Sequence, residues 1–224
     1  MGQSFMAVQA SADRPQHHRI RRGILVGILV GIVVMAMAAP AVQAGAVDCV
    51  VSPGVTQTAT TVTGTSGDDT IDCGGANPGK TIYGRGGNDT ITGTAFHDTI
   101  KGGRGNDTLT GGGRGDVLNG GPGRDTMTGS AGRDTLNGRG GDDTLSGGAG
   151  RDTLYGNRGD DTLSGGRRGD VLRGGRGTDI ISGNAGSDAL TGPPNDSRVD
   201  TLNGGTGSDT CQGPGSDGDT LVSC

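Results

Sequence analysis

Aspartate is the residue of this 224-residue sequence whose type and spacing could do chemistry. Twelve aspartates follow one another at intervals of nine residues without a slip: Asp89, Asp98, Asp107, Asp116, Asp125, Asp134, Asp143, Asp152, Asp161, Asp170, Asp179 and Asp188. The register extends, with small insertions, to Asp69 before them and to Asp200, Asp209 and Asp219 after them. All 24 acidic residues are Asp. A carboxylate that recurs at one phase of a repeat is a suitable oxygen ligand for a hard cation such as Ca²⁺.

Glycine and one apolar residue per unit form the elements that must position these aspartates. The chain contains 50 Gly, and a typical unit, residues 102–110, reads GGRGNDTLT. Positions one to six can turn tightly because Gly adopts positive φ, whereas positions seven to nine have the residues of a short β-strand. Stacked units would bury the apolar residues at position eight as one column. These residues are Ile91, Ile100, Leu109, Leu118, Met127, Leu136, Leu145, Leu154, Leu163, Leu172, Ile181 and Leu190.

A second period of 18 residues divides the units, counted from Gly84, into odd and even ones. Position four of every odd unit is Gly: Gly87, Gly105, Gly123, Gly141, Gly159 and Gly177. The even units have Phe96, Arg114, Gly132, Gly150, Arg168 and Gly186 there. We therefore predict an all-β parallel solenoid with two repeats per coil and two sheets back to back. Six regular coils at a strand spacing of ~4.8 Å would be about 29 Å long.

The GGxGxDxUx unit resembles the nonapeptide of the RTX (repeat-in-toxin, hemolysin-type) calcium-binding proteins. The resemblance covers residues 64–222 and implies a right-handed parallel β-roll. It also implies several Ca²⁺ ions between neighbouring turns of one edge, bound by backbone carbonyls and the position-six aspartates. The implied metal residues are the aspartates named above and the position-four glycines of the odd units. Departures from the pattern are Phe96, His97, Arg114 and Arg168, and Arg124, Arg133 and Arg151 at position five.

Two further expectations concern the cation. Stacking brings the carboxylates into like-charge columns, so we expect the roll to be largely unfolded without Ca²⁺ and to fold when Ca²⁺ binds. The odd row keeps Gly at every position four, so we expect its ions to be held more tightly than those of the even row, where Phe96, Arg114 and Arg168 intervene.

Residues 1–44 have the order of a secretory signal peptide: a basic run ending at Arg22, an apolar run over 23–39, and Ala44 at the cleavage point. An uncleaved anchor is the alternative, but the apolar run is at the short limit for a membrane span. Export by the Sec or the twin-arginine route stays open. We expect an extracellular, secreted protein, free or associated with the cell surface, with no membrane span after cleavage. Residues 45–63 would form an N-terminal cap, 84–191 the regular repeats, 192–222 irregular ones, and 223–224 the C-terminal end.

All four cysteines, Cys49, Cys73, Cys211 and Cys224, follow the predicted leader, and their number is even. We expect Cys49 to pair with Cys73 and Cys211 with Cys224, because a bridge between the two ends of a ~29 Å roll exceeds disulfide reach. The extra residues within 73–83 and 192–203 should form outward bulges.

Other functions are weaker interpretations of the sequence. From residue 45 onward, 15 Lys and Arg stand against 23 Asp, a net charge of −8, which argues against nucleic acid or anionic lipid as a partner. No catalytic constellation is visible, so we expect no enzyme activity. Alternatives are a cell-surface adhesin, through Arg-Gly-Asp at 114–116, 158–160 or 168–170, and an ice- or crystal-binding protein that uses its flat Thr/Ser face. The sequence does not identify a cell-wall or other surface partner.

Overall fold

Each nine-residue unit forms one turn and the start of one strand. In the regular units the strand begins at position seven, directly after the aspartate, and runs into position three of the next unit, as in β8 (Thr108–Gly113). Side chains at positions seven and nine face outward, and those at position eight face inward, as the alternation of a strand requires. The predicted strand at positions seven to nine is therefore present but extends three residues further.

The computed structural model describes residues 48–192, 198–213 and 219–224, all within one compact unit, Val42–Cys224. The predicted leader at 1–44 and residues 193–197 of the bulge predicted at 192–203 lie outside the described residues. Within the described ranges, no helix is long and apolar enough to span a membrane.

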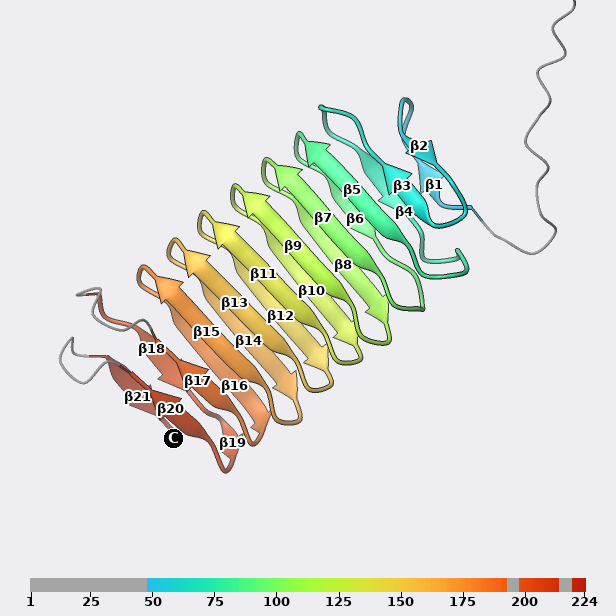
Figure 1. Ribbon diagram of the computed structural model, residues 1–224. Helices are drawn as coiled ribbons and strands as arrows, with labels where there is room; N and C mark the ends of the chain where they lie inside the picture. Colours follow the sequence, from blue (N-terminus) through green and yellow to red (C-terminus); the bar gives the residue numbers. More distant parts are fainter. Residues whose placement is uncertain (1–47, 193–197, 214–218) are drawn as a thin grey trace, which may run out of the picture. The chain divides into compact units, whose positions relative to one another are not determined.

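The strands form two stacked sheets, which we call sheet A and sheet B (Figure 1). Sheet A contains β1 (Val50–Val51), β4 (Thr70–Asp72), β6 (Thr90–Thr92), β8, β10 (Thr126–Ala131), β12 (Thr144–Ala149), β14 (Thr162–Arg167), β16 (Ile180–Gly186), β18 (Thr201–Asn203), β19 (Thr206–Gly207) and β21 (Thr220–Val222). Sheet B contains β2 (Thr56–Gln57), β3 (Thr61–Thr63), β5 (Thr81–Gly86), β7 (Thr99–Arg104), β9 (Val117–Pro122), β11 (Thr135–Gly140), β13 (Thr153–Arg158), β15 (Val171–Arg176), β17 (Ala189–Thr191) and β20 (Thr210–Gln212).

Consecutive strands alternate between the sheets, so each coil contains two repeats. Neighbouring strands within a sheet are parallel, and in the regular coils each residue pairs with the residue 18 positions further along the chain, for example Leu145 with Leu163 in sheet A. Among the described strands, only β1 and β2 pair in antiparallel fashion, with β4 and β3 respectively. β3, which the sequence assigned to the cap, already pairs in parallel with β5. The predicted two-sheet parallel solenoid is confirmed.

The core is the predicted column of position-eight side chains between the two sheets. Ile91, Leu118, Leu145 and Leu172 are at most 1% exposed, and Val62, Ile71, Ile82 and Leu202 extend the column at the ends. Leu221 continues the sequence register but is 51% exposed, because no further coil covers it. One apolar side chain per unit is therefore enough for a continuous core.

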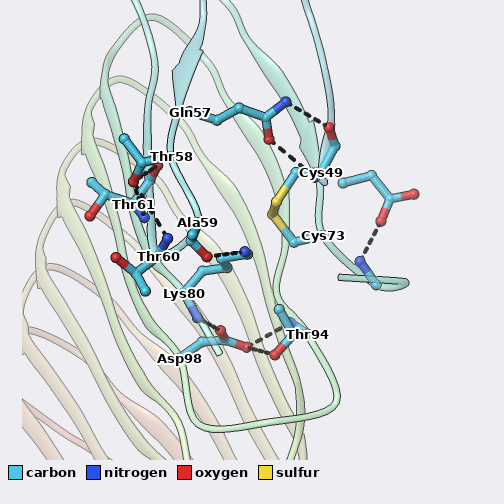
Figure 2. The surroundings of a disulfide bond; sticks show 12 residues. Cys49, Gln57, Thr58, Ala59, Thr60, Thr61, Cys73, Lys80, Thr94 and Asp98 are labelled. Atoms are coloured by element: carbon cyan, nitrogen blue, oxygen red, sulfur yellow. Dashed lines mark hydrogen bonds between the residues drawn. A yellow bond between two sulfur atoms is a disulfide. The ribbon is translucent and has the colours of Figure 1, made fainter. Parts of the chain in front are cut away.

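Disulfides close both ends of the roll with the predicted pairing, Cys49–Cys73 and Cys211–Cys224. At the N-terminal end, the Gln57 amide accepts a hydrogen bond from Cys49 N and donates one to Cys49 O, which fixes the cap strand beside the bridge (Figure 2).

Candidate metal centre: the aspartate rows

The position-six aspartates stack into two rows, one at each edge of the roll. The backbone N–H of each aspartate donates to Oδ1 of the aspartate one coil further on: Asp107 N to Asp125 Oδ1 at 2.8 Å, and Asp116 N to Asp134 Oδ1 at 2.7 Å. The odd row contains Asp69, Asp89, Asp107, Asp125, Asp143, Asp161, Asp179, Asp200 and Asp219. The even row contains Asp98, Asp116, Asp134, Asp152, Asp170, Asp188 and Asp209. The structure thus brings together every aspartate of the predicted metal set.

The second carboxylate oxygen is different, because it is buried and accepts no hydrogen bond from the described residues in most of the rows. This holds for Oδ2 of Asp89, Asp107, Asp116, Asp125, Asp134, Asp143, Asp152, Asp161, Asp170, Asp188 and Asp219. A buried charged oxygen without a partner is costly, and cation coordination or protonation are the two ways to remove that cost.

Oδ2 lies against the position-one glycine of its own unit, beside a backbone carbonyl of the next coil. A Cβ added to Gly138 would be 2.2 Å from Asp143 Oδ2 and 2.9 Å from Gly156 O. The equivalent two oxygens lie beside Gly84, where a Cβ would be 2.2 Å from Asp89 Oδ2 and 2.4 Å from Gly102 O. Only glycine leaves this space open between a carboxylate and a carbonyl oxygen. Both oxygens are of the kind that Ca²⁺ prefers.

The rows supply one carboxylate per coil and edge rather than a cluster of side chains. Among the described residues, no three His, Cys, Asp or Glu side chains come together to hold a metal ion. A cation in these turns would therefore depend on backbone carbonyls for most of its ligands. The donor set, all oxygen and mostly neutral, fits Ca²⁺ better than a transition metal.

Burial raises the pKa of ten of the row aspartates, and at most of these ten neighbouring carboxylates add to the effect. The pKa of Asp161 is raised to about 8, that of Asp143 to about 7 and that of Asp116 to about 7. Burial is the largest cause at all three, and the backbone hydrogen bond to Oδ1 opposes it. At neutral pH Asp161 therefore holds a proton in the folded chain, which a cation could replace.

In two aspartates of the N-terminal coils both carboxylate oxygens accept hydrogen bonds, which the sequence did not predict. Asp98 Oδ2 accepts hydrogen bonds from Thr94 N at 2.6 Å and Thr94 Oγ1 at 2.9 Å (Figure 2). Asp69 Oδ2 accepts equivalent bonds from Thr65 N and Thr65 Oγ1. Asp69 and Asp98 are therefore satisfied by the protein itself.

Backbone conformation at position two explains this exception. Position two has positive φ in the other regular units, for example Gly103 at 123°, Ser130 at 84° and Asn157 at 81°. Thr94 does not, because a β-branched residue strongly disfavours positive φ. The Thr94 N–H then points at the carboxylate. A β-branched residue at position two was the sequence signal for this difference.

Lys80 occupies the first place of the even row, where an aspartate would be expected from the phase. Its backbone N–H donates to Asp98 Oδ1, and its Nζ donates to Ala59 O in the cap (Figure 2). The signal in the sequence was its position two residues before Ile82, the same offset that each aspartate has from its apolar residue. Lys80 thus begins the even row with a backbone N–H donor and no carboxylate of its own.

The two edges differ less around the aspartates than the sequence suggested. In the odd units a Cβ at Gly141 would be 1.9 Å from Gly123 O, so position four requires glycine. In the even units Arg114 and Arg168 adopt positive φ at 65° and 79°, and the row continues past them with the same hydrogen bond. The stronger ion binding expected for the odd row stays a prediction.

The odd edge has a second, outer ladder at position five that the sequence interpretation also missed. Asn106 N donates to Asn88 Oδ1, and Thr178 N donates to Asp160 Oδ1, both at 2.8 Å. Asp160 also lies 3.7 Å from an Arg198 guanidinium nitrogen. Asp160, the aspartate of the Arg-Gly-Asp triplet at 158–160, nevertheless stays exposed. Asp116 and Asp170 of the other triplets are buried.

A comparison with protein families agrees with this geometry. The sequence model described as RTX calcium-binding nonapeptide repeat (4 copies) matches residues 56–77, 83–118, 110–145, 137–167, 164–192 and 196–213. These segments span more than half of the chain. No curated protein matches it.

Proposed function

Because the chain belongs to the family of RTX calcium-binding nonapeptide repeats, we propose that it binds several Ca²⁺ ions along its two aspartate rows and folds as it binds them. The observation that carries the proposal is the series of buried Oδ2 atoms without a hydrogen-bond partner, each beside a carbonyl oxygen of the next coil. Ca²⁺ would supply the positive charge that these oxygens lack, so binding free energy becomes folding free energy.

The proposed ligands are the row aspartates whose Oδ2 is unpartnered, together with turn carbonyls. Asp69 and Asp98 are left out, since Thr65 and Thr94 already bond their Oδ2 atoms. Position-four glycines such as Gly87 and Gly141 have a supporting role, because they allow neighbouring turns to approach closely.

We place this protein outside the cell, as a non-catalytic calcium-binding or surface protein. Two disulfides support the location, because such bonds persist in oxidising surroundings. Extracellular Ca²⁺ would then start folding after export.

Ion counting on the wild-type chain and two variants tests the proposal. Asp143→Ala removes an odd-row ligand and Asp116→Ala an even-row ligand, and both residues are 1% exposed. We expect several Ca²⁺ ions per wild-type chain, a loss in each variant, and a larger loss for Asp143→Ala. Equal losses would contradict the difference between the rows. No bound Ca²⁺ in the wild-type chain would contradict the whole proposal.

A second candidate function rests on the outer face of sheet A. Thr108, Thr126, Thr144 and Thr162 lie in register on adjacent strands and are exposed. Regular hydroxyl rows on a flat sheet could order water, as an ice- or crystal-binding surface does. An ice-recrystallisation assay tests this function, and Thr126→Lys with Thr144→Lys should abolish any activity that this face has.

A further inference from the structure

The exposed charges of the roll are mostly positive, although the sequence as a whole is acidic. Fourteen aspartates between Asp69 and Asp200 are buried. The exposed acidic side chains between residues 60 and 192 are Asp68, Asp72, Asp142 and Asp160. In the same range the exposed cations are Arg85, Lys101, Arg104, Arg114, Arg124, Arg133, Arg139, Arg151, Arg158, Arg167, Arg168, Arg173 and Arg176. The net charge used to argue against polyanionic partners therefore counts carboxylates that do not face solvent.

One edge concentrates these cations, and we name it the arginine edge: Arg114, Arg133, Arg151, Arg167 and Arg168. These arginines are exposed and lie at the even turns of four consecutive coils, ~4.8 Å apart along the roll. None forms an ion pair with another described residue. The odd edge is different, since its Arg124 pairs with Asp142 at 3.1 Å.

A shallow hollow of about 710 Å³ opens on the arginine edge. Three guanidinium groups line it, from Arg133, Arg151 and Arg168. Thr153 and Ser187 add hydroxyl groups, and Val171 and Ala189 add small apolar surfaces. Guanidinium groups bind carboxylate or sulfate in bidentate fashion, hydroxyl groups bond to hydroxyl groups, and small apolar side chains pack against the C–H faces of a sugar ring.

We propose that the arginine edge binds an extended acidic polysaccharide, with a carboxylate or sulfate group of one sugar in this hollow and neighbouring acidic groups on the arginines of adjacent coils. A linear chain fits because the cations repeat along the roll axis. The described arginine edge has two aromatic rings, Phe96 and His97. Arg114 lies over the Phe96 ring at 5.6 Å and His97 Nδ1 is hydrogen-bonded to Gly115 O, so this edge offers no series of free rings on which successive nucleic-acid bases could stack.

The hollow also contains Asp152 and Asp170 of the even row, which are buried. Bound Ca²⁺ would offset their charge beneath the site, so the inference rests in part on the proposed function. The measurement must therefore record calcium binding and polysaccharide binding separately on the same protein.

The experiment measures binding of the disulfide-intact protein, in saturating Ca²⁺, to immobilised hyaluronan, which carries carboxylates, and to dextran sulfate. Neutral dextran, single-stranded DNA and phosphatidylserine vesicles are the comparison probes. The test variant changes Arg133, Arg151 and Arg168 to Gln. The matched control changes Arg104, Arg158 and Arg176, at the opposite end of sheet B strands, to Gln, so the net charge of the two variants is equal.

We expect at least one acidic polysaccharide to bind, the test variant to lose on the order of tenfold in affinity, and the control to lose less than about twofold. Preference for hyaluronan or for dextran sulfate identifies the acidic group. Equal losses in the two variants, or tighter binding to DNA or to vesicles, would overturn the inference. Calcium binding without polysaccharide binding would overturn it while leaving the proposed function intact. Polysaccharide binding without calcium binding would overturn the proposed function and leave the polysaccharide inference intact.

Discussion

At the scale of single residues, the row aspartate divides its two oxygens between two tasks. Oδ1 accepts the N–H of the preceding coil and holds the coils in register. Oδ2 has no such bond in most units and lies beside a carbonyl oxygen of the next coil. An aspartate can therefore be needed for folding in Ca²⁺ and be unfavourable for folding without it.

Asp161→Asn tests this division of tasks. The amide keeps an oxygen for the Asp143 N–H and carries no charge that must be neutralised on burial. Without Ca²⁺ at neutral pH we expect the variant to be more stable than the wild type by about 1 kcal/mol or more, because the wild type must protonate Asp161 to fold and the variant need not. In Ca²⁺ we expect it to bind the ion on the order of tenfold more weakly. The folded fraction in EDTA, from far-UV circular dichroism, measures the first effect, and a Ca²⁺ titration measures the second.

Asp98→Asn is the matched control for this experiment. Both Asp98 oxygens already accept hydrogen bonds, from Thr94 and from Lys80 N. The substitution should destabilise the protein in EDTA, the opposite sign to Asp161→Asn. Stabilisation by both variants would contradict the distinction between satisfied and unsatisfied carboxylates.

The raised pKa values also predict how stability depends on pH in the absence of Ca²⁺. Asp161 titrates at about 8 and Asp143 at about 7 in the folded chain, against an ordinary value near 3.8. Between about pH 4 and pH 8 the folded chain therefore holds more protons than the unfolded one. The free energy of unfolding must fall as pH rises through this range. Far-UV circular dichroism in EDTA should show a larger folded fraction at about pH 5 than at about pH 8, and the reverse order would contradict the prediction.

At the scale of the strand and turn, most of the fold could be predicted because few residues decide it. Position eight places Leu145 and Leu163 in the core, and the 18-residue split separates the two sheets. The hydrogen bonds of Thr94 and Lys80 were not predicted, since they depend on how one turn meets another coil. The position-five ladder was not predicted for the same reason, because the Asn106 N–H bonds to Asn88 of another coil.

The terminal disulfides should act locally, because each solenoid coil contacts only its neighbours. Cys211 and Cys224 are 13 residues apart, and replacing both with Ala should cost about 3 kcal/mol at the C-terminal end. Hydrogen exchange should lose protection in β20 and β21 and keep it in β9–β13. Cys49→Ala with Cys73→Ala should show the same pattern at β1 and β4. Loss of protection throughout the roll in either variant would contradict local action.

At the scale of the whole molecule, the two ends differ in how much they depend on a cation. The N-terminal coils satisfy Asp69 and Asp98 with Thr65 and Thr94, and the even row begins at Lys80, which adds no carboxylate. The middle coils lack these partners. We therefore expect calcium-dependent folding to start from the N-terminal end.

The distribution of charge between the core and the surface is also a property of the whole roll. Burial of the rows removes most carboxylates from the surface, so the chain is acidic in composition but exposes mainly arginine between residues 84 and 176. Net charge from the sequence could not predict this, because it does not separate a row aspartate such as Asp143 from its exposed neighbour Asp142.

The measurement that tests the central claim most directly is far-UV circular dichroism of the disulfide-intact protein at neutral pH, first in EDTA and then with excess Ca²⁺. The account predicts a mostly unfolded spectrum in EDTA and a β-sheet spectrum after Ca²⁺ is added, with Mg²⁺ unable to replace it. A β-sheet spectrum that is the same in EDTA and in Ca²⁺ would contradict the account, because the buried aspartate rows would then be stable without a cation.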